Sequence, residues 1–207
     1  ALRDYKRHMK WIAELNENFP EAEAGVTLHA GELTLGLVPP RHLGWHIREA
    51  VMVAGADRIG HGIDISYDEH MFETLAYMAE NKIAVEINLT SNEVILGVKG
   101  EDHPFATYMA NGVPLTISTD DEGVSRIDLT NEYHRLVRTY DVDYATLVSL
   151  SRNSLQDRFL PGGALFEDTY TGRKTEECRH IADSKSVKRR DSCAELLSSS
   201  HKASLQW

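Results

Sequence analysis

Short runs rich in apolar residues recur along the chain, and polar residues follow each of them directly. The runs occupy residues 26–28, 58–60, 83–89 and 113–119. Between them, apolar residues recur at intervals of three and four, which is typical of amphipathic helices. We therefore predict four strands that alternate with helices, as in right-handed β-α-β units of a parallel sheet.

The expected helices occupy residues 2–18, 43–54, 68–81, 103–111, 129–140 and 144–153. Asp68 is a candidate cap for the third helix, and Asn111-Gly112 is a typical helix end. After Pro161-Gly162-Gly163 the sequence becomes polar and loses its period. We expect one α/β domain over residues 1–165 and a C-terminal extension over 166–207, with a final helix within 194–207.

Four β-α units leave the sheet with two open edges, whose unpaired backbone groups favour association. Eight units would close a barrel of roughly 250 residues. The pattern therefore leaves two possibilities for the α/β fold: a small open sheet, or the second half of a barrel whose first half precedes residue 1.

Side chains that bind metals or transfer protons follow the expected strands. His29 and Glu32 follow the first strand, His61 the second, and Asp120 with Asp121 the fourth. The C-terminal ends of parallel strands carry the active sites of α/β folds. Imidazole nitrogens and carboxylate oxygens are zinc ligands, and a carboxylate beside the metal can act as an acid or a base. The set predicts a metal-dependent hydrolytic site.

Each motif also has a structural interpretation. His29 could be a packed loop residue and Glu32 a helix cap, while His61 could serve a tight turn and the Asp120-Asp121 pair could cap a helix. Four successive strand ends that each carry a histidine, a carboxylate or an amide favour the functional interpretation.

The remaining motifs have weaker chemistry. Gly31 lets the backbone turn and a ligand approach closely. Thr90-Ser91-Asn92 is suited to contact a substrate, to orient metal ligands, or to cap a helix. The eight histidines other than His29 and His61, His103 among them, are interpreted as packing or surface residues.

Composition narrows the function classes. A formal net charge of −10 argues against binding to nucleic acid or an anionic membrane. No apolar stretch approaches the roughly 20 residues that span a bilayer. Cys178 and Cys193 lack the close pairing of zinc sites; they either form a disulfide in an oxidising compartment or remain two unpaired thiols.

Taken in order, His-Ala-Gly-Glu, Arg-Ile-Gly-His-Gly, Thr-Ser-Asn and Ser-Thr-Asp-Asp resemble the adenosine deaminase family. Residues 129–133 and 152–160 add to the similarity, which covers about residues 1–165. The resemblance implies a (β/α)8 TIM barrel of which this chain covers roughly strands five to eight, plus the extension. It also implies one Zn2+ and hydrolytic deamination of adenosine and 2′-deoxyadenosine, giving inosine or its deoxy form and ammonia in purine nucleoside catabolism.

The resemblance assigns metal binding to His29 and Asp120. Glu32 would protonate the purine ring at N1, His61 would orient the attacking hydroxide, and Asp121 would position the water or accept a hydrogen bond from the substrate. The implied substrate-binding residues are Gly31, Asp121 and Asn92.

One element of the family is absent from the sequence. The family's other two zinc ligands form a His-x-His pair, and no such pair occurs in this chain. We therefore expect an upstream half, and we expect the isolated chain to bind zinc weakly, turn over little and associate through open barrel edges.

Other functions stay open beside the purine nucleoside assignment. The alternatives are a related aminopurine deaminase, acting on adenine or another adenine nucleoside, and a truncated or non-catalytic binding protein. The cysteines favour a periplasmic or secreted location over a cytoplasmic one.

Overall fold

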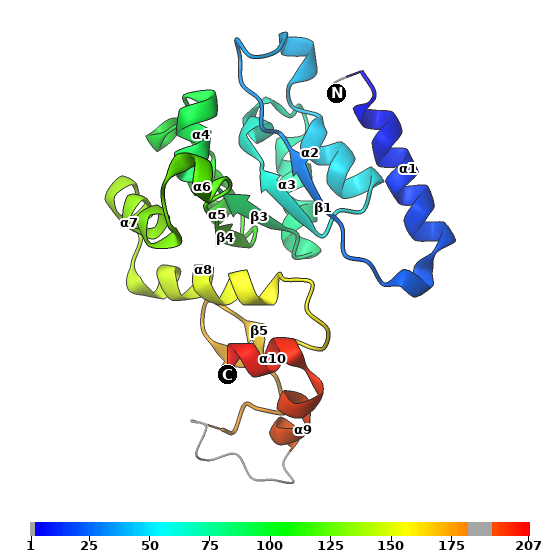
Figure 1. Cartoon of the computed structure of the whole chain (residues 1–207), viewed down its shortest axis with the longest axis vertical. Coiled ribbons are helices and arrows are strands. Elements are labelled where there is room, and N and C mark those ends of the chain that lie inside the picture. Colours follow the sequence, from blue (N-terminus) through cyan, green and yellow to red (C-terminus); the bar gives the residue numbers. More distant parts are fainter. Residues whose placement is uncertain (1–2, 182–191) are drawn as a thin grey trace. The chain divides into compact units, whose positions relative to one another are not determined.

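The computed structural model describes residues 3–181 and 192–207 (Figure 1). Contacts within the chain define two compact units, Ala1–Asp141 and Val142–Trp207. The boundary expected at residues 165/166 lies inside the second unit.

The first unit is built on a four-stranded parallel sheet. Its strands are β1 (Thr27–Ala30), β2 (Arg58–His61), β3 (Ala84–Ile87) and β4 (Leu115–Ile117), which lie side by side in chain order (Figure 1). The four apolar runs therefore form the predicted strands. The buried positions of β3 lie on both of its faces, as is usual for a central parallel strand.

Helices of the first unit connect and cover these strands. They are α1 (Tyr5–Asn18), α2 (His46–Arg48) with a π-helical turn (Glu49–Val53), α3 (Met71–Glu80), α4 (Leu89–Leu96), α5 (Phe105–Ala110), α6 (Glu122–Ser125) and α7 (Leu129–Thr139). Short 3₁₀ turns occupy Pro20–Ala22, Pro40–His42, Ile63–Tyr67 and Gly100–Asp102.

Two details differ from the sequence-based expectation. Helix α4 begins directly after Asn88, so Thr90-Ser91-Asn92 lies in its first turn, and the Asp120-Asp121 pair directly precedes α6. The predicted cap was wrong, because α3 begins after His70. Asp68 instead accepts hydrogen bonds from the backbone N–H of His70 at 2.8 Å and from the Thr74 hydroxyl at 2.7 Å.

The second unit begins with α8 (Tyr144–Gln156) and continues into the antiparallel pair β5 (Phe166–Asp168) and β6 (Arg173–Lys174). The expected final helix is divided into α9 (Ser192–Ser199) and α10 (His201–Gln206). Ser200 separates them, and its Oγ caps α10 by accepting the backbone N–H of Ala203 at 3.0 Å. No helix in the described parts of the chain is long and apolar enough to cross a bilayer.

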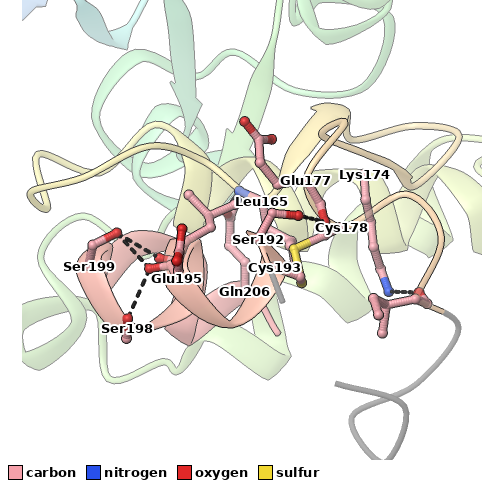
Figure 2. Close-up of a disulfide and its surroundings, with 12 residues drawn as sticks. Leu165, Lys174, Glu177, Cys178, Ser192, Cys193, Glu195, Ser198, Ser199 and Gln206 are labelled. Atoms are coloured by element: carbon pink, nitrogen blue, oxygen red, sulfur yellow. Dashed lines mark hydrogen bonds between the residues drawn. A yellow bond between two sulfur atoms is a disulfide. The ribbon is translucent and has the colours of Figure 1, made fainter. Parts of the chain in front are cut away.

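A disulfide joins Cys178 to Cys193 in the second unit (Figure 2), which decides between the two alternatives that the sequence left open. Both cysteines are fully buried. Near the bridge, the Lys174 ammonium lies 4.2 Å from the centre of the Trp207 ring and donates a hydrogen bond to the Ile181 carbonyl at 2.8 Å. The apolar residues around the bridge are Leu165, Phe166, Ile181 and Ala203, with Leu196, Leu197 and Trp207 packed against them.

The disulfide is expected to stabilise this small cluster against local unfolding. Replacing both cysteines by serine should lower its stability by about 3 kcal/mol, because the bridge closes a loop of 15 residues. Hydrogen exchange of the α9 and α10 amides should then accelerate roughly a hundredfold. The exposed Ser198→Ala variant in α9 is the control, and equal exchange in the double variant and the wild type would contradict a stabilising bridge.

Candidate metal centre

Three side chains with metal-binding atoms meet at the C-terminal edge of the sheet. His29 lies in β1, His61 ends β2 and Asp120 follows β4. Their ligand atoms all lie within 4.8 Å of one another. The register that pairs Ala30 with His61 sets the two imidazole rings 5.0 Å apart. His61 is buried, Asp120 is half-buried and His29 is exposed, so the cluster could hold a metal that a ligand can reach.

The backbone at two of these residues adopts an uncommon conformation. His61 has φ = 70° and Asp120 has φ = 54°, in the left-handed region that non-glycine residues rarely occupy. Each such residue costs on the order of 1–3 kcal/mol, and such strain concentrates at functional sites. Gly62 continues the left-handed turn, and a Cβ there would lie 2.6 Å from the Tyr108 hydroxyl. That hydroxyl donates a hydrogen bond to the Gly62 carbonyl at 2.6 Å. The turn after His61 is therefore packed against Tyr108 and hydrogen-bonded to it.

Glu32 reaches the same edge from the turn after β1. Its Oε1 lies 3.6 Å from Nδ1 of His61. Gly31, just before it, has φ = 71°, and a Cβ there would lie 2.8 Å from Ile47 and would collide with the Asp64 carboxylate. The buried Asp64 donates its backbone N–H to the Gly31 carbonyl at 2.9 Å. A glycine is therefore required for the turn that presents Glu32.

Helix α4 contacts the cluster through two neighbouring residues. Ser91 donates its hydroxyl to Oδ2 of Asp120 at 2.6 Å. The Asn92 side-chain amide lies between two rings, 2.9 Å from Nδ1 of His61 and 2.9 Å from Nε2 of His103. Residues that hold metal-binding side chains in this way fix their orientation. The first turn of α4 thus positions both Asp120 and His61.

His103 is a buried, neutral base. Burial, and secondarily the charge of His61, lowers the pKa of His103 to about 4. Its Nδ1 accepts the backbone N–H of Phe105 at 3.1 Å, a group at the start of α5 that has no partner within its own helix. His103 therefore joins the start of α5 to Asn92.

A buried carboxylate fixes the start of α4. Glu132 in α7 is fully buried and accepts the backbone N–H of Thr90 at 3.2 Å together with the Thr90 hydroxyl in a short hydrogen bond. Arg135 donates to the same hydroxyl at 3.3 Å and forms an ion pair with Glu93. A negative charge near a helix N-terminus is also favoured by the helix dipole.

The structure brings most of the predicted site residues to one edge. His29, His61 and Asp120 come together, Glu32 lies beside His61, and Asn92 is buried against it. Asp121 is exposed at the start of α6.

Sequence reasoning missed His103 and Glu132. Their partners Asn92 and Thr90 lie 11 and 42 residues away. A histidine before Pro104 and a glutamate within a helix gave no local sign of these pairings.

Comparison with known proteins identifies the origin of this arrangement. The sequence model of the family described as "Adenosine deaminase" matches residues 6–164. An adenosine deaminase from Shewanella loihica is 34% identical over 152 residues, covering 72% of this chain and 43% of that protein. One from Clostridium perfringens is 33% identical over 135 residues, covering 65% of this chain and 37% of that protein. The chain thus spans about two fifths of the length of these curated relatives.

Solved structures show the same fold. An N6-methyl-AMP deaminase from Arabidopsis thaliana is 28% identical with a TM-score of 0.56, covering 70% of this chain and 39% of that one. An adenine deaminase from Arthrobacter aurescens (23% identical) has a TM-score of 0.57, with 72% and 42% covered. A Burkholderia ambifaria amidohydrolase with bound Zn (21% identical) has a TM-score of 0.54, with 69% and 37% covered. The last two likenesses concern the fold alone.

The parallel strands and the cluster at their C-terminal edge place the chain among the (β/α)8 barrel proteins that carry their chemistry at that edge. Within that class, the chain belongs to the adenosine deaminase family. The predicted fold, consecutive strands of a TIM barrel followed by an extension, is confirmed.

The depressed pKa of His103 predicts a loss of stability on acidification. Unfolded chains protonate histidine near pH 6.5 whereas folded His103 protonates near pH 4, so between these values the unfolded state binds more protons. This residue should therefore lower the free energy of unfolding by about 3 kcal/mol on going from pH 7 to pH 4. Denaturant unfolding at several pH values measures this slope, which should flatten in His103→Gln but not in His134→Gln, the exposed control in α7. An unchanged slope in His103→Gln would contradict the assignment.

The buried carboxylate of Glu132 is expected to stabilise the start of α4. In Glu132→Gln, an amide N–H₂ group replaces one of the two oxygens that accept hydrogen bonds from Thr90. The loss of an acceptor should lower the free energy of unfolding by about 2 kcal/mol. Thermal unfolding beside Glu80→Gln, an exposed change in α3, measures the difference. Equal stability of the two variants would argue against a stabilising role of Glu132 at the start of α4.

Proposed function

We propose that this chain supplies one side of a zinc site that deaminates adenosine by hydrolysis. The observation that carries the proposal is the His29–His61–Asp120 cluster with Glu32 3.6 Å from His61, in a chain of the adenosine deaminase family. Water would add at C6 of the purine, the C6–N bond would break, and ammonia would leave to give inosine.

The residues present fit part of a zinc site. His29 and Asp120 offer an imidazole nitrogen and a carboxylate oxygen, and the Ser91 hydroxyl bonded to Asp120 fixes the direction of that carboxylate. Catalytic zinc usually has three protein ligands, and in this proposal the family's upstream His-x-His pair would supply the others. When bound, zinc lowers the pKa of a coordinated water to about 7 and makes it a nucleophile near neutral pH.

The chain's own residues would bind the substrate and move its protons. Glu32, at the mouth of the sheet, would donate a proton to N1 of the ring as water adds at C6, because that addition places negative charge on N1. His61, held from behind by Asn92, would hydrogen-bond the attacking oxygen. Asp121, which is exposed, would accept a hydrogen bond from the substrate or the water, and Gly31 leaves room for the ring beside Glu32.

The proposal names adenosine as the substrate, and related aminopurines are the alternatives to be tested against it. The similar proteins are named for adenosine, adenine and N6-methyl-AMP, so these three compounds are the informative comparison. The Cys178–Cys193 disulfide supports a periplasmic or secreted location for the protein.

The proposal predicts activity once the missing ligands are supplied. We would join the chain to the part of the Shewanella loihica adenosine deaminase that precedes the matched region, load zinc, and follow adenosine, adenine and N6-methyl-AMP by ultraviolet absorbance. Adenosine should be deaminated fastest. Glu32→Gln should lower kcat by a factor of about 10²–10⁴ and leave the zinc content unchanged, since the side chain moves a proton and is not needed to bind the metal.

Two controls make this experiment decisive. The exposed Glu80→Gln variant should keep full activity. Asp120→Asn should reduce zinc binding, measured by equilibrium dialysis on the unfused chain as well as on the fusion. A folded, zinc-loaded fusion that leaves all three compounds unchanged would refute the deaminase function.

A further inference from the structure

We propose that His103 and Asn92 together hold His61 in the tautomer whose proton lies on Nε2, so that His61 serves the site as a hydrogen-bond donor and not as a metal ligand. His103 and Asn92 are then positioning residues. The role given to His61 rests on the proposed function, but the tautomer itself follows from hydrogen bonds within the chain.

The first fixed point is the peptide N–H of Phe105, which can only donate. It donates to Nδ1 of His103 at 3.1 Å, so that nitrogen carries no proton. His103 is buried and neutral, and a neutral imidazole has one N–H. The proton of His103 therefore lies on Nε2, the atom that faces Asn92.

The Asn92 amide links the tautomer of His103 to the tautomer of His61. We call this series of hydrogen bonds, from Phe105 through His103 and Asn92 to His61, the relay. Its two ends have nearly the same shape, and hydrogen-bonding partners decide which end faces which ring. Because Nε2 of His103 donates, it requires the Asn92 oxygen, and the opposite orientation would make both nitrogens of His103 acceptors. The structure places the Asn92 oxygen toward Nδ1 of His61 and the Asn92 nitrogen toward Nε2 of His103, each at 2.9 Å. Exchanging the two ends of the amide satisfies His103 and makes the Asn92 nitrogen the donor to Nδ1 of His61, which leaves the proton of His61 on Nε2.

The second fixed point is independent of the first. The Asn88 side-chain nitrogen lies 3.4 Å from the Glu86 carbonyl, which can only accept, so this end of the amide is the N–H₂ group. The same nitrogen lies 3.4 Å from Nδ1 of His61. Two amide donors, one from the N-cap residue of α4 and one from within α4, therefore converge on Nδ1, and both require it to be unprotonated.

One acidic group faces the same ring nitrogen. Glu32 Oε1 lies 3.6 Å from Nδ1 of His61, farther than a hydrogen bond, and does not displace the amide at 2.9 Å. On the other side of the ring, Nε2 lies 3.9 Å from Oδ2 of Asp120. The N–H of His61 thus faces the metal-binding carboxylate, and neither ring nitrogen keeps a lone pair for a metal.

Nuclear magnetic resonance of the full chain, metal-free near pH 7 and labelled with ¹⁵N at histidine, tests this directly. Long-range ¹H–¹⁵N correlations show which ring nitrogen is protonated, and signals lost in His61→Gln and His103→Gln assign the two rings. We expect the Nε2–H form for both. An Nδ1–H form of either ring would overturn the inference, and this spectrum decides it without any variant of Asn92.

An isosteric change should reverse the tautomer. In Asn92→Asp, the carboxylate can only accept, so it keeps the bond from His103 and demands a proton on Nδ1 of His61. The exposed Asn81→Asp change after α3 makes the same chemical substitution and should leave both rings as in the wild type. A folded Asn92→Asp chain whose His61 keeps an unprotonated Nδ1 would contradict the relay.

The spectra and the deaminase assay test the two proposals independently of each other. Nε2–H rings in a protein whose zinc-loaded fusion has no deaminase activity would refute the proposed function and leave the relay standing. An active fusion with Nδ1–H on His61 would do the reverse. A merely structural role for Asn92 would change stability but would not move the proton between ring nitrogens.

Discussion

Parallel pairing of four neighbouring strands brings His29, His61 and Asp120 to one edge of the sheet. The register sets Ala30 opposite His61 and Ile87 opposite Ile117, so the strands end at one common edge. A shift by one residue would turn each side chain to the other face of the sheet. The cluster therefore exists because the apolar cores of the strands pack in only one register.

Several side chains behind this edge are buried and hydrogen-bonded to one another. His61, Asn92 and His103 form one chain of contacts, and Glu132 holds Thr90 at the start of the same helix. A buried polar group without a partner costs about 1–3 kcal/mol, so each member of these contacts depends on its neighbour. His61 has a strained backbone conformation, and such conformations persist only where surrounding contacts hold them.

The sequence predicted the strands and the residues at their ends because period and composition are local properties. Helix starts were less predictable: α4 begins within a segment that was interpreted as the end of a strand, since Leu89 is compatible with both. The partners of His103 and Glu132 were not predictable, because their hydrogen bonds depend on contacts between elements that only the folded chain brings together. The disulfide was one of two options until Cys178 and Cys193 were seen in one apolar cluster.

Ser91 and Asn92 are consecutive in α4, yet one holds Asp120 and the other holds His61. The two side chains consequently do not have independent positions, because both follow the same helical turn. The Ser91 hydroxyl holds Asp120 at 2.6 Å, and the Asn92 amide lies 2.9 Å from His61. One helical turn of α4 therefore sets the positions of two side chains that come from different strand ends of the sheet.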